Sequence, residues 1–226
     1  MLNDIQKHVL EVVSGMAAGA QGAVNIRANG KRAYHSNCEG VRIESKTDKE
    51  GIDIIIEPGV VADHVYIPVV VTEEGFHDVV YNDFYIGEDC DVTIVAGCGI
   101  HNGGDAASEH SGIHRFFLKK NAKIKYVEKH YGSGEGTGER IMNPTTEMVL
   151  DEGAYMEMDT VQIKGVDSTK RVTKAELGEG ATLVIKEKLM THGKQFAETE
   201  FTVDLNGAGS SANVISRSVA KGTSHQ

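Results

Sequence analysis

The residues of this chain that are best suited to chemistry lie between positions 98 and 114. Cys98-Gly-Ile-His101 is followed by His110 and His114. Thiolate and imidazole groups are ligands for zinc, iron and copper, and a Cys-x2-His spacing lets both side chains reach a single ion. Cys98, His101, His110 and His114 are therefore candidate metal ligands.

A second interpretation of these residues stays open. Their spacings match no closed zinc motif. Side chains alternate between the two faces of a strand, which places His114 on the same face as Phe116 and favours a hydrogen-bonded core histidine. His101 and His110 are favoured as loop histidines, because the polar, glycine-rich stretch Asn102–Gly112 is expected to form a long loop.

Other reactive residue types give weaker patterns. The chain contains an internal repeat, and Cys90 stands at a position that alanine occupies in three other repeats. It is therefore expected to be a small buried side chain. His130 is expected at the end of a strand with no evident partner, and Glu187 is expected on the solvent face. The segment Gly132–Glu139 lacks the Gly-Lys-Ser/Thr of a phosphate-binding loop and is expected only to connect strands.

An internal repeat indicates which elements position these residues. Each repeat has an aliphatic anchor, a polar turn, a small residue four positions on, and apolar residues six and eight positions on. The anchors are Ile86, Leu118, Leu150, Leu177 and, more weakly, Leu205, at spacings of 32, 32, 27 and 28 residues. The pattern predicts two short strands per repeat, with one apolar face against a core.

Two architectures fit this repeat: an antiparallel meander closing into a barrel or sandwich, and a solenoid. A small residue recurring just after a turn favours the solenoid, because equivalent positions stack and a tight corner has little room. The predicted fold is therefore mainly β, a parallel β-helix. Residues 1–50 are expected to form a helix and lead-in, and residues 51–226 the β-helix core.

The N-terminal segment has a different period. Apolar residues recur at helical spacing over Asn3–Val13, with Asn3 or Asp4 as the N-cap. The small residues of Gly15–Gly22 break that pattern, and a flexible stretch is expected there. The fold class is thus a β-helix with one short N-terminal helix.

Composition excludes several classes of protein. The 226 residues carry a net charge of −10, whereas a nucleic-acid binder needs a basic surface, so no nucleic-acid partner is expected. The apolar run Val65–Val71 is too short to cross a bilayer, and no membrane association is expected. Three cysteines provide no disulfide framework, which favours a reduced cytoplasm.

Several motifs resemble the SufB/SufD family of iron–sulfur cluster assembly proteins. They are Thr93–Asn102, Glu109–His114, Ile124–His130, Met190-Thr-His-Gly193 and Ser216–Gln226. The resemblance covers about residues 50–226, and the N-terminal region resembles the short form of the family. It implies a right-handed parallel β-helix, in agreement with the repeat.

The resemblance also implies a function and partners. Such proteins are non-enzymatic scaffolds on which a transient iron–sulfur cluster is assembled, together with the ATPase SufC. The family usually continues beyond the Ser-His-Gln at positions 224–226, so a C-terminal segment is expected to be missing here. Pairing through that end with a second copy or a SufB/SufD paralogue is expected.

Two alternatives to the scaffold stay open. One is a mononuclear metal-binding β-helical protein that uses the four candidate ligands. The other is a β-helical carbohydrate-active or carbohydrate-binding protein. It would need aromatic platforms or paired carboxylates, and it is disfavoured because aromatic residues make up 6% of the chain and tryptophan is absent.

Overall fold

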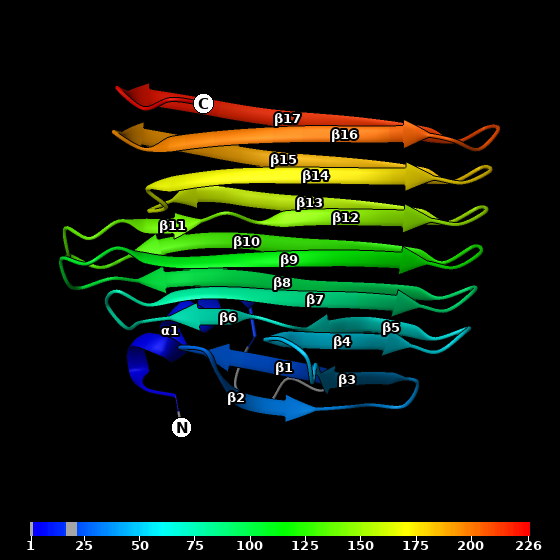
Figure 1. Cartoon of the computed structure of the whole chain (residues 1–226), viewed down its shortest axis with the longest axis horizontal. Coiled ribbons are helices and arrows are strands. Elements are labelled where there is room, and N and C mark those ends of the chain that lie inside the picture. Colours follow the sequence, from blue (N-terminus) through cyan, green and yellow to red (C-terminus); the bar gives the residue numbers. More distant parts are fainter. Residues whose placement is uncertain (1, 17–21) are drawn as a thin grey trace.

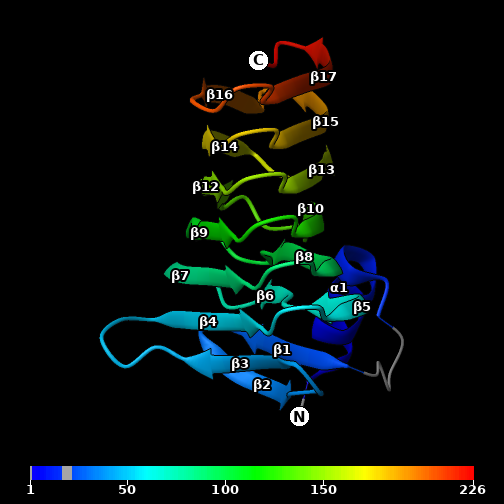
Figure 2. The ribbon, with the colours of Figure 1, turned by 90° about the vertical axis from the view of Figure 1, so that its right-hand side faces the viewer.

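The computed structural model describes residues 2–16 and 22–226 and shows a mainly β protein with one helix. Its strands are stacked into a column (Figures 1 and 2). The elements are α1 (Asp4–Ser14), β1 (Ala23–Ala28), β2 (Lys31–Ser36), β3 (Val41–Ser45), β4 (Gly51–Ile56), β5 (Val61–Tyr66), β6 (Val69–Val71), β7 (His77–Ile86), β8 (Asp91–His101), β9 (Ser108–Leu118), β10 (Lys123–Ser133), β11 (Arg140–Met142), β12 (Thr145–Leu150), β13 (Tyr155–Lys164), β14 (Ser168–Leu177), β15 (Thr182–Gly193), β16 (Phe196–Leu205) and β17 (Ser211–Gly222).

The strands form two sheets that face each other across the interior (Figure 2). Sheet A has the order β17-β15-β13-β10-β8-β5-β1-β2, with β6 beside β1 and β8. Sheet B has the order β11-β14-β12-β9-β7-β4-β3, with β16 beside β14. From β4 onward, the strands that follow one another within each sheet pair in parallel. Along the chain, successive strands mostly alternate between the two sheets. The fold is therefore a parallel β-helix. The predicted solenoid is confirmed and the antiparallel meander is excluded.

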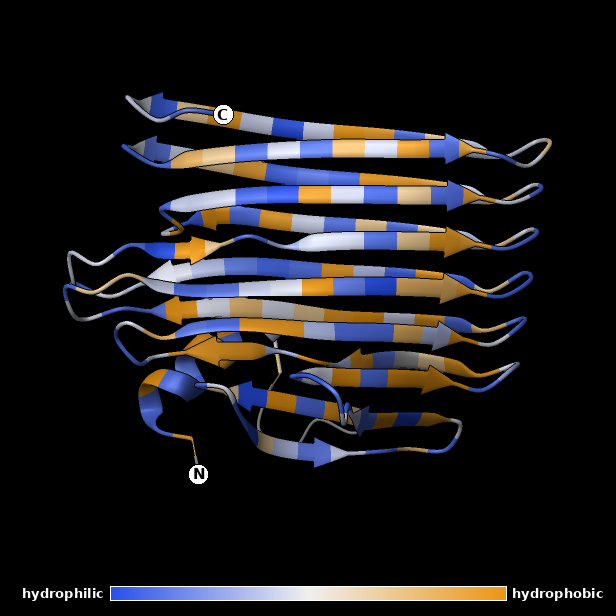
Figure 3. Cartoon of the chain, in the orientation of Figure 1, coloured by the Kyte–Doolittle hydropathy of each residue, from blue (hydrophilic) through white to orange (hydrophobic). Residues whose placement is uncertain are grey.

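The repeat anchors stack on one another as predicted. Ile86 pairs with Leu118, Leu118 with Leu150, Leu150 with Leu177, and Leu177 with Leu205. The apolar residues after each turn also stack, and together with the anchors they form one large core cluster in the part of the interior next to these turns. Alternating apolar and polar residues are visible along most strands in Figure 3. The small residues at the corners, Cys90, Ala122, Ala154 and Ala181, are all buried.

The N-terminal elements lie at one end of the solenoid, with α1 beside sheet A (Figures 1 and 2). Asn3 is the N-cap of α1, and its side chain and that of Gln6 form a reciprocal capping box, which confirms the predicted helix. The flexible stretch expected at Gly15–Gly22 lies largely outside the described residues. Strands β1–β2 and β3–β4 pair antiparallel, in contrast to the parallel turns that follow. The division at residue 50 stays a prediction.

Pro68 separates two strands of sheet A. The apolar stretch Val65–Thr72 forms β5 and β6, with Pro68 between them, because proline cannot donate to a sheet ladder. Over the ranges 2–16 and 22–226, no helix is both long enough and apolar enough to cross a membrane.

Helix α1 packs on the outer face of sheet A at two glycines of β8. A Cβ atom on Gly97 would lie 2.4 Å from the carbonyl oxygen of Val13, and one on Gly99 would lie 2.1 Å from a methyl group of Val9. Val9 and Val13 are buried together with Val24 and other apolar residues. Cys98 lies between these glycines, so the outward-facing positions beside it are covered by the helix.

Substituting Gly97 by alanine should displace α1, because the new methyl group would meet helix backbone rather than a flexible side chain. We expect a loss of about 1–3 kcal/mol in the free energy of unfolding, the usual cost of overpacking a core. Denaturant unfolding followed by circular dichroism measures it. Gly103→Ala is the matched control, since a Cβ there meets nothing within 4 Å. Equal stability of both variants would contradict the docking.

Candidate functional site

Polar and ionisable side chains line the part of the interior next to the apolar core. They project inward from both sheets and are buried despite their charge or hydrogen-bonding groups. This interior polar cluster consists of Cys98 (β8), Glu128 and His130 (β10), Gln162 (β13) and Glu187 (β15) from sheet A, and of Asp78 (β7), His110 and His114 (β9) and Arg171 (β14) from sheet B.

Glu128 lies at the centre of the cluster. Its carboxylate accepts a hydrogen bond from Arg171 Nη1 at 2.7 Å and another from Tyr126 Oη at 3.1 Å. The Nε2 atoms of His114 and His130 lie 3.8 and 3.6 Å from the same carboxylate. Burial acts to raise the pKa of Glu128, but the Arg171 charge and the neighbouring His130 outweigh it and hold this pKa well below its usual range.

Arg171 connects two buried carboxylates. Besides Glu128, its guanidinium faces Glu187, with Nε 3.7 Å from Oε1. The Glu187 carboxylate also accepts hydrogen bonds from Thr199 Oγ1 and Ser216 Oγ. The expectation that Glu187 lies on the solvent face is wrong. It continues the inward alternation of Leu183 and Ile185 along β15, and it is 5% exposed.

His130 is also an interior residue, not an unpartnered residue at the end of a strand. Strand β10 continues to Ser133, three residues beyond it. The side chain is 3% exposed, and Nδ1 lies 3.1 Å from Gln162 Oε1 on the next strand of sheet A. The expectation was wrong because the strand is longer than its apolar pattern.

Cys98 pairs in register with Val69 of β6 on one side and with His130 of β10 on the other. Its side chain is 5% exposed. Burial, reinforced by the negative charge of Glu128, raises the pKa of the Cys98 thiol well above its ordinary value. The thiol is therefore protonated in the folded protein at neutral pH, and a nucleophilic thiolate needs a change in these surroundings.

This environment predicts slow alkylation of Cys98. With iodoacetamide at neutral pH, the half-buried Cys38 is expected to react at least tenfold faster than Cys98, because only a thiolate with access to the reagent reacts. Peptide mass spectrometry over time gives both rates, and unfolded protein supplies the reference in which all three cysteines react. Equal rates for Cys38 and Cys98 in the folded protein would contradict the burial.

The two histidines of β9 are both buried. The loop expected over Asn102–Gly112 ends before Ser108, where β9 begins, so the assignment of His110 to a loop is wrong. His110 Nδ1 lies 3.5 Å from Asp78 Oδ2. His114 is the predicted core histidine, with Nδ1 3.4 Å from Asn82 Nδ2. Burial lowers the pKa of His114 to about 4, although Glu128 acts in the opposite direction.

The four candidate metal ligands do not all point to one place. His101 follows Cys98 by three positions on β8, so its side chain leaves the strand on the opposite face, where Nδ1 lies 3.0 Å from Ser133 Oγ. Cys98, His110 and His114 face the interior. Among the described residues, no group of three or more His, Cys, Asp or Glu side chains could hold a metal ion. The metal-ligand role of these four residues stays a prediction.

Fold and cluster together define a parallel β-helical protein whose interior is part apolar and part charged. Residues 82–226 match the family described as "SUF system FeS cluster assembly, SufBD core domain". That match covers more than half of the chain, and the chain belongs to the SufBD family. The resemblance inferred from the sequence motifs is thereby confirmed.

Curated relatives are consistent with this assignment. An "iron-sulfur cluster assembly SufBD family protein" of Archaeoglobus fulgidus is 28% identical over 143 residues, which is 63% of this chain. A homologue from Methanothermobacter thermautotrophicus (strain Winter) is 28% identical over 157 residues, or 68% of this chain. In both cases the match spans only 37% of the relative's own length.

Proposed function

We propose that this chain is a non-enzymatic scaffold subunit for iron–sulfur cluster assembly in the cytoplasm, working with a SufC-type ATPase. Iron and sulfide are its cargo, and the cluster is held transiently. Pairing with a second copy or with a SufB/SufD paralogue is part of the proposal. The match of residues 82–226 to the SufBD core is the observation that carries it.

The interior polar cluster supports the proposal by the chemistry of its donors. Thiolate, imidazole and carboxylate groups are ligands that bind iron in proteins. The buried, protonated thiol of Cys98 is protected from oxidation while it is idle. We propose that Cys98, with the inward-facing His110 and His114, contacts the cargo when the surrounding structure opens.

Anaerobic reconstitution tests the scaffold function. The protein is incubated with ferrous iron and sulfide, alone and with the SufC-type ATPase, and its absorption is recorded after desalting. In the presence of the ATPase, we expect sulfur-to-iron charge-transfer absorption in the visible region. Absence of a cluster both with and without the ATPase would contradict the scaffold function.

The partner is tested separately, by co-purification of the tagged chain with the ATPase. Retention of the ATPase on the tagged chain is the expected result. If a cluster forms but the ATPase is not retained, the ATPase partnership is wrong and the scaffold stands.

A further inference from the structure

The outer face of sheet B carries a column of residues, one from each of six strands, that runs along the solenoid axis. Successive members are in-register partners on neighbouring parallel strands. The first four are apolar and the last two are acidic. This axial column consists of Ile55 (β4), Tyr85 (β7), Phe117 (β9), Val149 (β12), Glu176 (β14) and Asp204 (β16).

Two of the four apolar members of the column are exposed to solvent, and Ile55 and Phe117 are half-buried. Tyr85 is 44% exposed and Val149 is 39% exposed. The rings of Tyr85 and Phe117 are stacked, with centroids 5.5 Å apart and planes inclined by 12°. A shallow hollow of about 200 Å³ lies beside Ile55, Tyr85 and Phe117. Contiguous exposed apolar surface of this kind is characteristic of a contact site.

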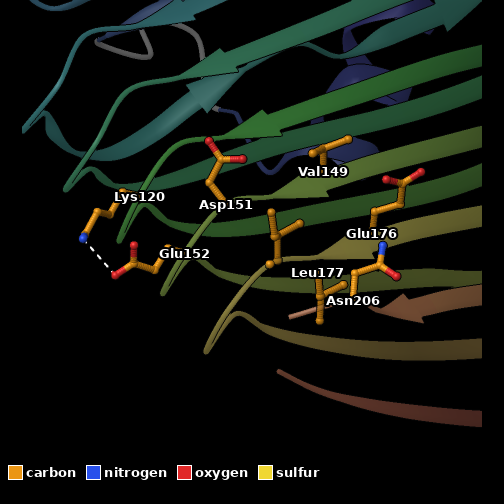
Figure 4. Close-up of a pocket in the computed structure, with 9 residues that line it drawn as sticks. Lys120, Val149, Asp151, Glu152, Glu176, Leu177 and Asn206 are labelled. Carbon is orange, nitrogen blue, oxygen red and sulfur yellow. Dashed lines mark hydrogen bonds and ion pairs between the residues drawn. The ribbon is translucent and has the colours of Figure 1, made fainter. Parts of the chain in front are cut away.

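A second hollow, of about 490 Å³, lies where the apolar part of the column meets the acidic part (Figure 4). It is lined by Val149 and Glu176 of the column and by Asp151 and Glu152 of the adjoining turn. Figure 4 shows these carboxylates around the hollow.

Most charges near the column already have partners. Lys119 Nζ lies 3.1 Å from Asp151, and Lys120 Nζ lies 2.8 Å from Glu152. Arg115, on the neighbouring column, forms an ion pair with Asp83. Among the described residues, Glu176 and Asp204 form no ion pair, although they are direct neighbours of like charge. The column therefore ends in two adjacent acidic side chains, with Lys174 as the next outward-facing residue of β14.

The spacing of the column matches an α-helix that lies along the solenoid axis. Neighbouring strands are about 4.8 Å apart, and one helical turn rises about 5.4 Å. Each turn of such a helix would meet about one rung, and the six rungs correspond to a helix of about 16 residues. Apolar side chains at i, i+3 or i+4 and i+7 would meet Ile55 to Val149.

We propose that the axial column is a docking site for an amphipathic helix of a partner protein, with an apolar stripe over about three turns and lysine or arginine on the next two. Charge complementarity with Glu176 and Asp204 sets this chemistry and the direction of the helix. The outer face of sheet A has its own helix, α1, packed on β8. Figure 2 shows α1 beside sheet A, and it shows no element of the described chain over the outer face of sheet B.

Two synthetic helices test the proposal with the folded chain. One has leucine on successive turns followed by lysine on the next two, and the other has glutamate in place of lysine. Binding is measured by fluorescence anisotropy at physiological salt. We expect the lysine peptide to bind and the glutamate peptide to bind at least tenfold more weakly.

Variants locate the binding. Tyr85→Ser with Phe117→Ser should weaken the lysine peptide at least tenfold, whereas Ile163→Ser, which removes an exposed side chain from sheet A, should leave binding unchanged. Glu176→Lys with Asp204→Lys should reverse the preference between the peptides. Circular dichroism verifies that each variant is folded.

Three results of the binding experiments would overturn the proposal, and a fourth outcome concerns the oligomeric state. They are no binding of the lysine peptide to the wild-type chain, an equal loss in Ile163→Ser and in the double serine variant, and an unchanged preference after the charge reversal. Concentration-dependent dimerisation that the double serine variant abolishes would identify a second copy as the occupant and would also overturn it.

Discussion

Replacing Arg171 by methionine is expected to lower the free energy of unfolding by about 3–5 kcal/mol, the usual cost of removing one partner from a buried ion pair. Arg171 is 5% exposed and lies between Glu128 and Glu187, which are themselves 1% and 5% exposed. Without the guanidinium, the two carboxylates remain buried and lose the arginine charge that lies between them. Methionine retains most of the volume, so packing contributes little to the change.

Denaturant unfolding at pH 7 measures this effect, and two further variants isolate its cause. Lys170 lies beside Arg171 on β14 and forms an exposed ion pair with Glu198 of β16, so Lys170→Met should cost less than about 1 kcal/mol. Adding Glu128→Gln to Arg171→Met should recover part of the lost stability, because it removes one uncompensated charge. Equal costs at positions 170 and 171 would show that Arg171 does not stabilise the interior.

His114 should make the protein less stable as the pH falls from about 6.5 to about 4. Its pKa in the folded protein is lowered from an ordinary 6.5 to about 4. In this window the unfolded chain binds a proton and the folded chain does not, so stability decreases with decreasing pH. The full difference corresponds to about 3 kcal/mol. Protonation of Glu128 also lowers the stability, at lower pH, because its pKa is depressed in the folded protein and its stabilising charge is lost when it protonates.

Free energies of unfolding at a series of pH values test this dependence. His114→Gln cannot take up the proton, so its curve should be flatter than that of the wild type between pH 6.5 and 4. The exposed His192→Gln is the matched control and should follow the wild-type curve. A wild-type slope retained in His114→Gln would contradict the assignment of this pH dependence to His114.

The sequence predicted the solenoid well because its evidence is repeated at every turn. The anchors from Ile86 to Leu205 are separated by nearly constant intervals, and stacking requires each to meet its equivalent. The corner residues, such as Ala122, are small because each corner is tight and enclosed. A repeated steric constraint of this kind leaves a pattern that a single sequence reveals.

The interior polar cluster was only partly predictable. Glu187 continues the inward alternation of Leu183 and Ile185, so strict alternation along β15 would have placed it inside. Its charge suggested the solvent face instead. The link between Arg171 and Glu128 spans 43 positions and joins opposite sheets, and no local pattern reports such a contact. The prediction for Cys98 and His101 as a pair overlooked that a spacing of three on a strand separates two side chains to opposite faces.

We propose that the chain takes part in assembling an iron–sulfur cluster and that Cys98 in the interior polar cluster contacts that cluster. The most direct measurement is the iron and acid-labile sulfide retained per chain after anaerobic reconstitution with the SufC-type ATPase, for the wild type, Cys98→Ser and Cys90→Ser. Cys90 is a buried cysteine at an apolar corner and serves as the matched control. We predict that Cys98→Ser retains at least fivefold less iron and sulfide while Cys90→Ser equals the wild type. Equal retention in all three proteins would contradict the proposed role of Cys98.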